Sequence, residues 1–123
     1  MILVDTSVWA DHLRHTEPGL VALLNEGAVL IHRFVIEELA CGNLPNRKET
    51  LALLHSLPAA AAAEYAEVLD FIAGERLHGT GIGSVDAHLM ASARLAGAKV
   101  WSKDKAFCRE AKRLDLFGGE RPA

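Results

Sequence analysis

The sequence predicts an α/β fold in which helices flank a central parallel sheet. Residues 2–4 and 28–31 are short aliphatic runs of the kind that forms strands buried on both faces, and Val100-Trp101 centre a third run over 99–102. A helical pattern follows each run, and strands that alternate with helices pair in parallel through right-handed crossovers. With 123 residues, half of them apolar, the chain is long enough for one domain with its own core.

Helix start and stop signals divide the chain between these strands. In chain order we expect a strand over 2–4, helices over 7–14 and 18–25, a strand over 28–31, helices over 34–41, 47–57 and 62–73, a loop over 79–83, a helix over 84–95, a strand over 99–102 and a helix over 104–114. Thr6 and Ser7 can cap the first helix, and Ser84 can cap the sixth. Pro18 suits the first turn of the second helix, and Pro58 ends the fourth.

The sequence does not decide the secondary structure of two short stretches. The alanine run 59–63 favours helix by propensity, but it can also begin as an extended piece after Pro58. Leu116 and Phe117 could add an edge strand. We expect a single domain over 1–117 and a frayed tail over 118–123.

Net charge, cysteine content and the length of the apolar runs indicate which partners and which cellular compartment to expect. The net charge is −3, so any attraction to nucleic acid has to come from a local basic cluster or from metal ions. Cys41 and Cys108 lie far apart without a CxxC pattern, which fits free thiols in a reducing cytosol. No apolar run is long enough to span a bilayer, and Asp5 interrupts the N-terminus before a signal-peptide core could form. We therefore expect a cytoplasmic protein without a membrane partner.

Four acidic residues occupy related places in the predicted fold. Asp5 follows the first strand directly, and Asp104 follows the last. Asp86 lies in the first turn of a helix, where the dipole favours an anion, and Glu38 lies in the helix after the second strand. Parallel strands end at one edge of a sheet, where ligands of open α/β sheets gather. We expect the four carboxylates to converge there, although each alone could be a helix cap or a surface charge.

Converging carboxylates need cations or protons. Two of them about 4 Å apart repel by roughly 4 kcal/mol at an effective dielectric of about 20, so four cannot all stay ionised unaided. Oxygen ligands suit Mg²⁺ or Mn²⁺, whereas zinc prefers Cys and His. Such an ion can activate a water and stabilise the leaving oxygen in phosphodiester hydrolysis. The acid pattern therefore predicts a metal-dependent hydrolase.

Four sequence blocks surround the acids. They are Ile2-Leu3-Val4-Asp5-Thr6-Ser7-Val8-Trp9, Glu38-Leu39-Ala40-Cys41-Gly42, Val85-Asp86-Ala87-His88-Leu89-Met90-Ala91-Ser92-Ala93 and Val100-Trp101-Ser102-Lys103-Asp104-Lys105-Ala106-Phe107. In this order, over nearly the whole chain, they resemble the PIN-domain nucleases and among them the VapC-type toxins of toxin–antitoxin pairs. The resemblance implies a PIN-like three-layer sandwich with a central parallel sheet of about four to five strands flanked by helices.

The resemblance also implies a role for each acid and its neighbours. The catalytic and metal-binding residues would be Asp5, Glu38, Asp86 and Asp104, with Ser7 and Ser102 as polar supports. Glu38, and not the adjacent Glu37, carries the family's spacing to Gly42. The implied activity is that of a Mg²⁺-dependent endoribonuclease, the toxin of its pair, which hydrolyses phosphodiester bonds in tRNA, rRNA or mRNA with a metal-activated water; Mn²⁺ could replace Mg²⁺. The implied partners are the RNA substrate, a cognate VapB-type antitoxin and a second copy in a homodimer.

Two other functions stay open at this point. A housekeeping PIN nuclease of RNA processing would use the same site without arresting growth. A non-enzymatic signalling module, such as a phospho-acceptor receiver domain, also places acids at strand ends. It would need a second acid beside Asp5, where Thr6 and Ser7 stand.

Basic residues cluster after the fourth acid. Lys103, Lys105 and Arg109 are the candidates for contact with the phosphates of RNA, although about half of the basic residues there are expected to be an ordinary solvated helix face. His88 lies two residues past Asp86, so we expect its side chain to point away from the acids. The glycine-rich stretch 79–83 lacks the Lys-Ser or Lys-Thr of a P-loop and is predicted to form a mobile loop at the rim of the site.

Overall fold

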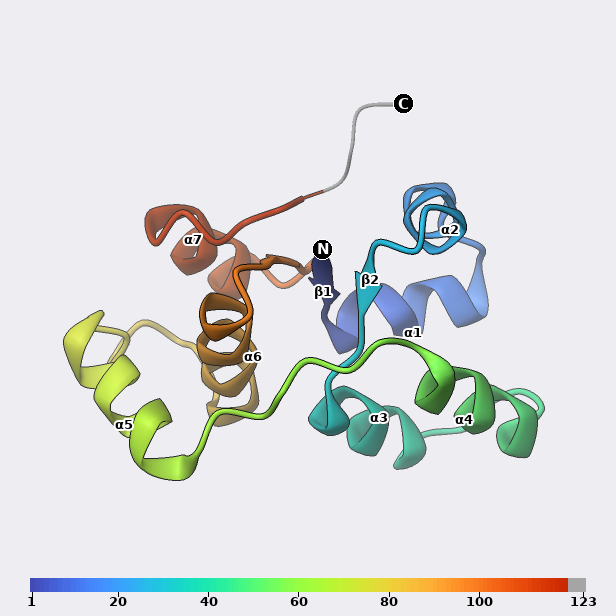
Figure 1. Cartoon of the computed structure of the whole chain (residues 1–123), viewed down its shortest axis with the longest axis horizontal. Helices are drawn as coiled ribbons and strands as arrows, with labels where there is room; N and C mark the ends of the chain where they lie inside the picture. The colour runs from blue at the N-terminus through green and yellow to red at the C-terminus, as the bar shows by residue number, and fades with distance from the viewer. Residues whose placement is uncertain (120–123) are drawn as a thin grey trace.

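The computed structural model describes residues 1–119 and contains three strands and seven helices in that range (Figure 1). In chain order these are β1 (Ile2–Val4), α1 (Thr6–Arg14), α2 (Pro18–Asn25), β2 (Val29–Leu30), α3 (Arg33–Ala40), α4 (Arg47–Ser56), α5 (Tyr65–Gly74), α6 (Ser84–Leu95), β3 (Lys99–Trp101) and α7 (Lys105–Arg113). The predicted elements are therefore present in the predicted order. Residues 120–123 of the expected tail lie outside the described residues.

The three strands form a parallel sheet in the order β2-β1-β3. Leu3 is paired with Leu30 on one side and with Val100 on the other. Isolated parallel bridges flank these strands, from Ile31 to Ala59 and from Val100 to Phe117. Five chain segments thus take part in the sheet, three of them as strands, which confirms a parallel sheet of roughly the expected width.

The segment after Pro58 is extended. The carbonyl of Pro58 accepts a hydrogen bond from Ile31 at 2.9 Å, and Ala60 donates to the carbonyl of Ile31 at 2.8 Å. Pairing with the end of β2 therefore overrides the helix propensity of the alanine run. Helix α5 starts only at Tyr65, three residues later than the helix expected from residue 62.

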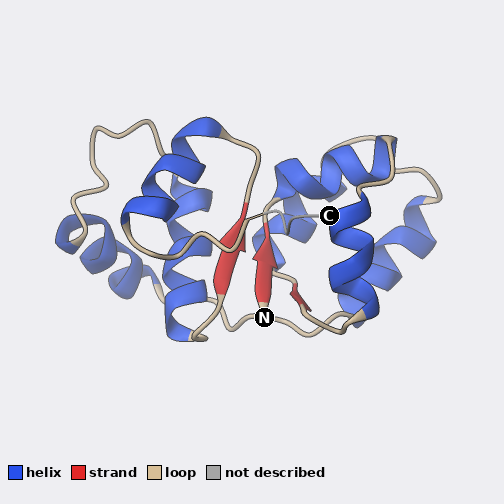
Figure 2. Cartoon of the chain, turned by 90° about the horizontal axis from the view of Figure 1, so that it is seen from above, coloured by secondary structure: helices blue, strands red, loops and turns tan. Residues whose placement is uncertain are grey.

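Helices cover both sides of the strands. Figure 1 shows α1, α2, α3 and α4 on one side of the strands and α5, α6 and α7 on the other, and Figure 2 shows the strands between these two groups. Fully buried side chains such as Val4, Leu89 and Phe107 join the sheet and the helices in one large core. Within residues 1–119, no helix has the length and apolarity needed to cross a bilayer.

The structure shifts two of the expected helix caps by one residue or more. Asp5 stands at the N-cap of α1, so Thr6 and Ser7 belong to its first turn, and Gly83 precedes α6 in place of Ser84. The carboxylate of Asp5 makes no capping hydrogen bond. The carboxylate oxygens of Asp5 are therefore available for other partners at the edge of the sheet.

Gly118, the first residue of the expected tail, packs against the opposite edge of the sheet. Its N–H donates to the carbonyl of Val100 at 2.7 Å. A Cβ atom there would lie 2.5 Å from Cδ1 of Ile2 and 2.9 Å from Cβ of Lys99, so the close approach requires glycine.

Candidate active site at the carboxyl edge of the sheet

Asp5 lies at the centre of the site, directly after β1. Its N–H donates to the carbonyl of Trp101 at 2.9 Å, which continues the pairing with β3 and sets Asp5 beside Ser102. The residue is only 5% exposed. Its Oδ2 atom accepts hydrogen bonds from the hydroxyls of Ser7 and Ser102, each at 2.8 Å. These two bonds fix the direction of the carboxylate.

The two serines link Asp5 to the loop that carries Asp104. Ser7 Oγ accepts the N–H of Lys103 at 3.0 Å, and Ser102 Oγ accepts the N–H of Asp104 at 3.0 Å. Asp104 is the N-cap of α7, where its Oδ1 accepts the N–H of Phe107 at 2.8 Å. The side chains predicted as polar supports therefore hold two of the predicted acids in a fixed relation.

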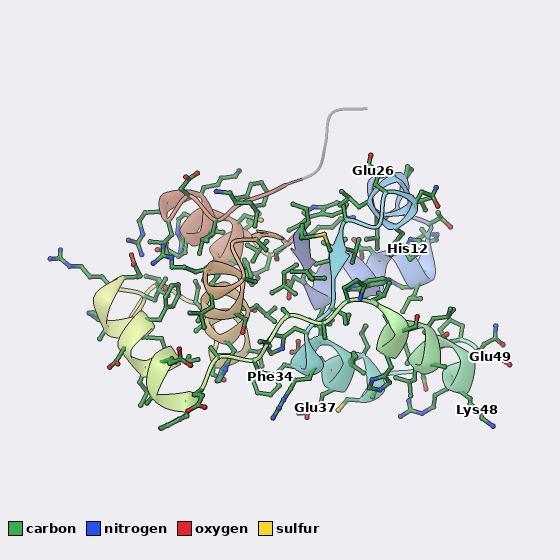
Figure 3. All side chains as sticks on the ribbon, in the orientation of Figure 1. His12, Glu26, Phe34, Glu37, Lys48 and Glu49 are labelled. Carbon is green, nitrogen blue, oxygen red and sulfur yellow. The ribbon has the colours of Figure 1, made fainter. Side chains whose placement is uncertain are left out.

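Glu38 joins the group from α3. Its Oε1 accepts the hydroxyl of Thr6, the residue after Asp5, at 2.6 Å. The neighbouring Glu37 is also exposed, and Figure 3 shows it on the outward side of α3. The contact with Thr6 favours Glu38 as the acid that belongs to the site.

Burial and the negative charges of the other three acids raise the pKa of Asp86. It lies in the first turn of α6, and its pKa is raised from 3.8 to about 6, first by burial, then by the negative charges of Asp5 and Asp104 and to a smaller extent of Glu38. A hydrogen bond from the backbone of Gly83 lowers the pKa and only partly offsets these effects. The structure thus brings the four predicted acids within electrostatic reach of one another.

The donor set of this acid group fits a hard divalent cation. All its ligating atoms would be carboxylate oxygens, the kind that Mg²⁺ and Mn²⁺ prefer. Among residues 1–119, no three acidic, histidine or cysteine side chains are grouped tightly enough to hold an ion as they stand. Three of the acids are instead turned toward hydroxyl or N–H donors of the chain. Asp86, whose charge the neighbouring acids oppose, is the one that a cation would help most to ionise.

The three candidate RNA-binding residues lie in different surroundings. Lys103 makes ion pairs with Asp11 at 3.1 Å and Glu17 at 2.8 Å, and the hydrogen bond that it donates to Glu17 is the main reason that its pKa is raised. Lys105 is exposed, and no ion pair within residues 1–119 involves it. The positive charge next to Asp104 is therefore more available at Lys105 than at Lys103.

Arg109 connects α7 to the glycine-rich loop. Its Nε pairs with Glu110 at 2.9 Å, and its Nη2 donates to the carbonyl of Thr80 at 2.5 Å. This loop leads into α6, which carries Asp86. Arg109 thus has a structural contact that the sequence did not indicate.

Sequence analysis missed a buried histidine beneath the site. His32 is fully buried at the N-cap of α3, where its Nδ1 accepts the N–H of Phe34 at 3.0 Å. Its other ring nitrogen lies 3.2 Å from Oγ of Ser92 on α6, which also accepts the N–H of Ala63 at 3.1 Å. Burial is the main cause that lowers the pKa of His32 to about 4, so the ring is neutral and joins α3 to α6. His32 and Ser92 are 60 residues apart, and no local sequence pattern predicts that they meet.

Comparisons with known proteins identify the family. A family model described as PIN domain matches residues 2–113. The chain is 45% identical over 114 residues to Ribonuclease VapC32 of two Mycobacterium tuberculosis strains, CDC 1551 and H37Rv, which covers 89% of this chain and 92% of the relative.

Solved structures share the fold. FitAcB from Neisseria gonorrhoeae matches with a TM-score of 0.65 and 21% identity over 99% of this chain and 98% of that one. PAE2754 from Pyrobaculum aerophilum matches with a TM-score of 0.67 and 15% identity over 96% and 87%. FitAB bound to the IR36 DNA fragment matches with a TM-score of 0.64 and 20% identity over 91% of each chain. The chain therefore belongs to the PIN-domain family and, within it, to the VapC-type ribonucleases.

Proposed function

We propose that this protein is a divalent-metal-dependent endoribonuclease that serves as the toxin of a toxin–antitoxin pair. The observation that supports the chemistry is the placement of Asp86, partly buried and near the negative charges of Asp5, Asp104 and Glu38, which raise its pKa. The similarity to Ribonuclease VapC32 supports RNA as the substrate. The carboxylate oxygens of the four acids support Mg²⁺ or Mn²⁺ as the cation.

The four acids divide two tasks between them in this proposal. Asp5, Asp86 and Asp104 would hold the cation, and Glu38 would either hold it or orient the attacking water. The hydroxyls of Ser7 and Ser102 keep the Asp5 carboxylate in one orientation, so less rearrangement is needed when the substrate binds. A cation bound there supplies the charge that neutralises the carboxylates and lets an anionic phosphodiester approach them.

An exposed basic side chain lies next to one of the acids in the sequence. Lys105 begins α7 directly after Asp104 and is exposed, so it can contact a phosphate of the substrate. Lys103 is engaged by two acids and contributes mainly by holding its loop against α1. We therefore assign phosphate contact first to Lys105, with Lys103 and Arg109 as weaker candidates.

The proposed protein partners follow from the family. A VapB-type antitoxin would neutralise the enzyme, and two copies of the chain would form a homodimer, as expected for VapC-type toxins. Exposed apolar side chains offer surface for such contacts, among them Leu53 on α4 and Leu69 and Leu95 on α5 and α6.

The test is a map of RNA ends that carry a 5′-phosphate, made after induced expression of the wild type and of Asp5→Asn. We expect new ends, concentrated at few sites, with the wild type alone, because asparagine keeps the size of the side chain but removes the charge that binds the cation. Asp70→Asn, an exposed acid on α5, should cleave like the wild type. Identical maps from the wild type and Asp5→Asn, with both proteins folded, would refute the proposal. Cleavage without growth arrest would instead indicate a nuclease of RNA processing.

A further inference from the structure

A hollow opens where α3, α5 and α6 meet the extended segment before α5. It has a volume of about 630 Å³ and is lined by Arg33, Phe34, Tyr65 and His88 together with residues 62–64. The volume lies in the range of sites that take small organic groups. None of these side chains has a role in the proposed chemistry of the acids.

Aromatic rings and a guanidinium group dominate the hollow. The rings of Phe34 and His88 meet edge to face with their centres 4.8 Å apart, and the guanidinium of Arg33 lies 5.6 Å from the centre of the Phe34 ring. Tyr65, the first residue of α5, is 74% exposed, which is unusual for a large aromatic side chain. Aromatic rings and guanidinium planes are the surfaces on which proteins stack the unpaired bases of RNA.

The polar groups of the hollow suit a base better than a phosphate. Nδ1 of His88 is buried and has no hydrogen-bond partner among the described residues, so its ring is held by packing alone. No ion pair within residues 1–119 engages Arg33, whereas Glu64 brings a negative charge to the same hollow. A carboxylate repels a phosphate, but together with a guanidinium it offers both an acceptor and donors to the edge of a base.

The hollow lies next to the proposed catalytic centre. Phe34 and Glu38 are four residues apart on α3, so they share one face of the helix about 6 Å apart along its axis. Figure 3 shows Phe34 on the part of α3 nearest to α6, and the Phe34 ring contacts that of His88 on α6, the helix that also carries Asp86. His32 accepts the N–H of Phe34 and lies within hydrogen-bond distance of Ser92 on α6, which links the start of α3 to α6 next to the hollow.

We propose that this hollow binds the base of an unpaired nucleotide next to the scissile phosphate, with Tyr65 and Phe34 as stacking surfaces and Arg33 as a donor. The inference rests on the proposed ribonuclease function and adds the side chains that contact this base. It makes these residues determinants of where the enzyme cuts.

The test measures binding and stacking separately. A short single-stranded RNA that carries the fluorescent base 2-aminopurine at successive positions is titrated with the full-length protein in the Asp5→Asn background with Mg²⁺, which prevents cleavage. We expect strong quenching at one position, because stacking on an aromatic ring quenches this base. Tyr65→Ala should lose that quenching and bind the RNA about 5- to 10-fold more weakly, which is the lower part of the range expected when one base loses its stacking partner. Tyr65→Phe should keep both, and Arg33→Ala should weaken binding by a similar factor.

Matched controls separate this effect from general electrostatics. Asp70→Asn changes an exposed side chain of the same helix outside the hollow, and Lys48→Ala removes a charge that Figure 3 shows at the far end of the molecule. Both should match the Asp5→Asn background. If RNA binds but Tyr65→Ala and Arg33→Ala change neither affinity nor quenching, the inference is wrong while the ribonuclease proposal stands. If no RNA binds in any background, both proposals fail together.

Discussion

Replacing Asp86 by asparagine should make the protein more stable in the absence of metal. The side chain lies among three other carboxylates and is partly buried, which raises its pKa from 3.8 to about 6. That rise corresponds to about 3 kcal/mol of unfavourable interaction for the ionised form, at 1.36 kcal/mol for each tenfold change in proton affinity. Because the side chain is only partly buried, solvent screening reduces the effect, and we expect Asp86→Asn to gain about 1–2 kcal/mol near pH 7.5.

The sign of the pH dependence provides a specific check. Between about pH 6 and pH 3.8 the folded protein binds the proton of Asp86 more tightly than the unfolded chain does. The destabilisation is therefore complete above pH 6 and disappears as the pH falls toward 3.8. The gain of Asp86→Asn over the wild type should shrink in the same window, since asparagine does not titrate.

Urea unfolding in the presence of a chelator, at about pH 7.5 and about pH 4.5, measures this gain. Asp70→Asn on α5 is the control and should stay within about 0.5 kcal/mol of the wild type at both pH values. Added Mg²⁺ should stabilise the wild type more than Asp86→Asn, because only the wild type keeps the full ligand set. A variant no more stable than the wild type at pH 7.5, or a gain that is the same at both pH values, would show that Asp86 is not opposed by its neighbours.

Three further predictions concern residues around the acids. Glu38→Gln should lower the initial rate of RNA cleavage at least about tenfold, whereas Glu37→Gln should leave it unchanged, because Glu38 contacts Thr6 beside Asp5. The opposite pattern would show that Glu37, and not Glu38, is the acid of the site. Lys105→Ala should weaken RNA binding and reduce the slope of log affinity against log salt by about one. Lys103→Ala should change that slope less, because two acids already pair with Lys103. An unchanged slope for Lys105→Ala would exclude a phosphate contact. The imidazole signals of His32 should not move between about pH 7 and pH 5 in an NMR titration, since the pKa is lowered to about 4. The contribution of His32 to the stability should fall as the pH drops from about 6.5 toward 4, because the unfolded chain then takes up the proton. Titration near pH 6.5 would show that the ring is not held neutral.

The fold and the closeness of the four acids could be predicted because both follow from local signals combined with parallel topology. Short aliphatic runs that end in Asp5 or lead to Asp104 locate the strands and the edge where they end. Parallel topology then brings residues far apart in sequence to that edge. The pairing of β1 with β3 confirms this step, since it sets Asp5 beside Ser102.

The parts that could not be predicted depend on contacts between distant residues. Nothing near His32 in the sequence points to Ser92, so the buried neutral ring had no local signal. Lys103 looked like a phosphate-binding residue until its contacts with Asp11 and Glu17 were known. The alanine run has the composition of a helix, and only the hydrogen bonds to Ile31 make it extended. His88 was expected to point away from the acids, but its contact with Phe34 could not be foreseen.

The packing of Gly118 against Ile2 has a practical consequence for handling the protein. Met1 and Gly118 both adjoin the sheet edge opposite the acids, as the bonds from Lys99 to the carbonyl of Met1 and from Gly118 to Val100 show. A tether placed near either position would hold the molecule with its acidic edge facing the solution, which suits immobilisation for surface-based RNA binding. The same proximity favours a circular permutant that joins the two ends by a short linker and opens the chain in the exposed loop at 42–43.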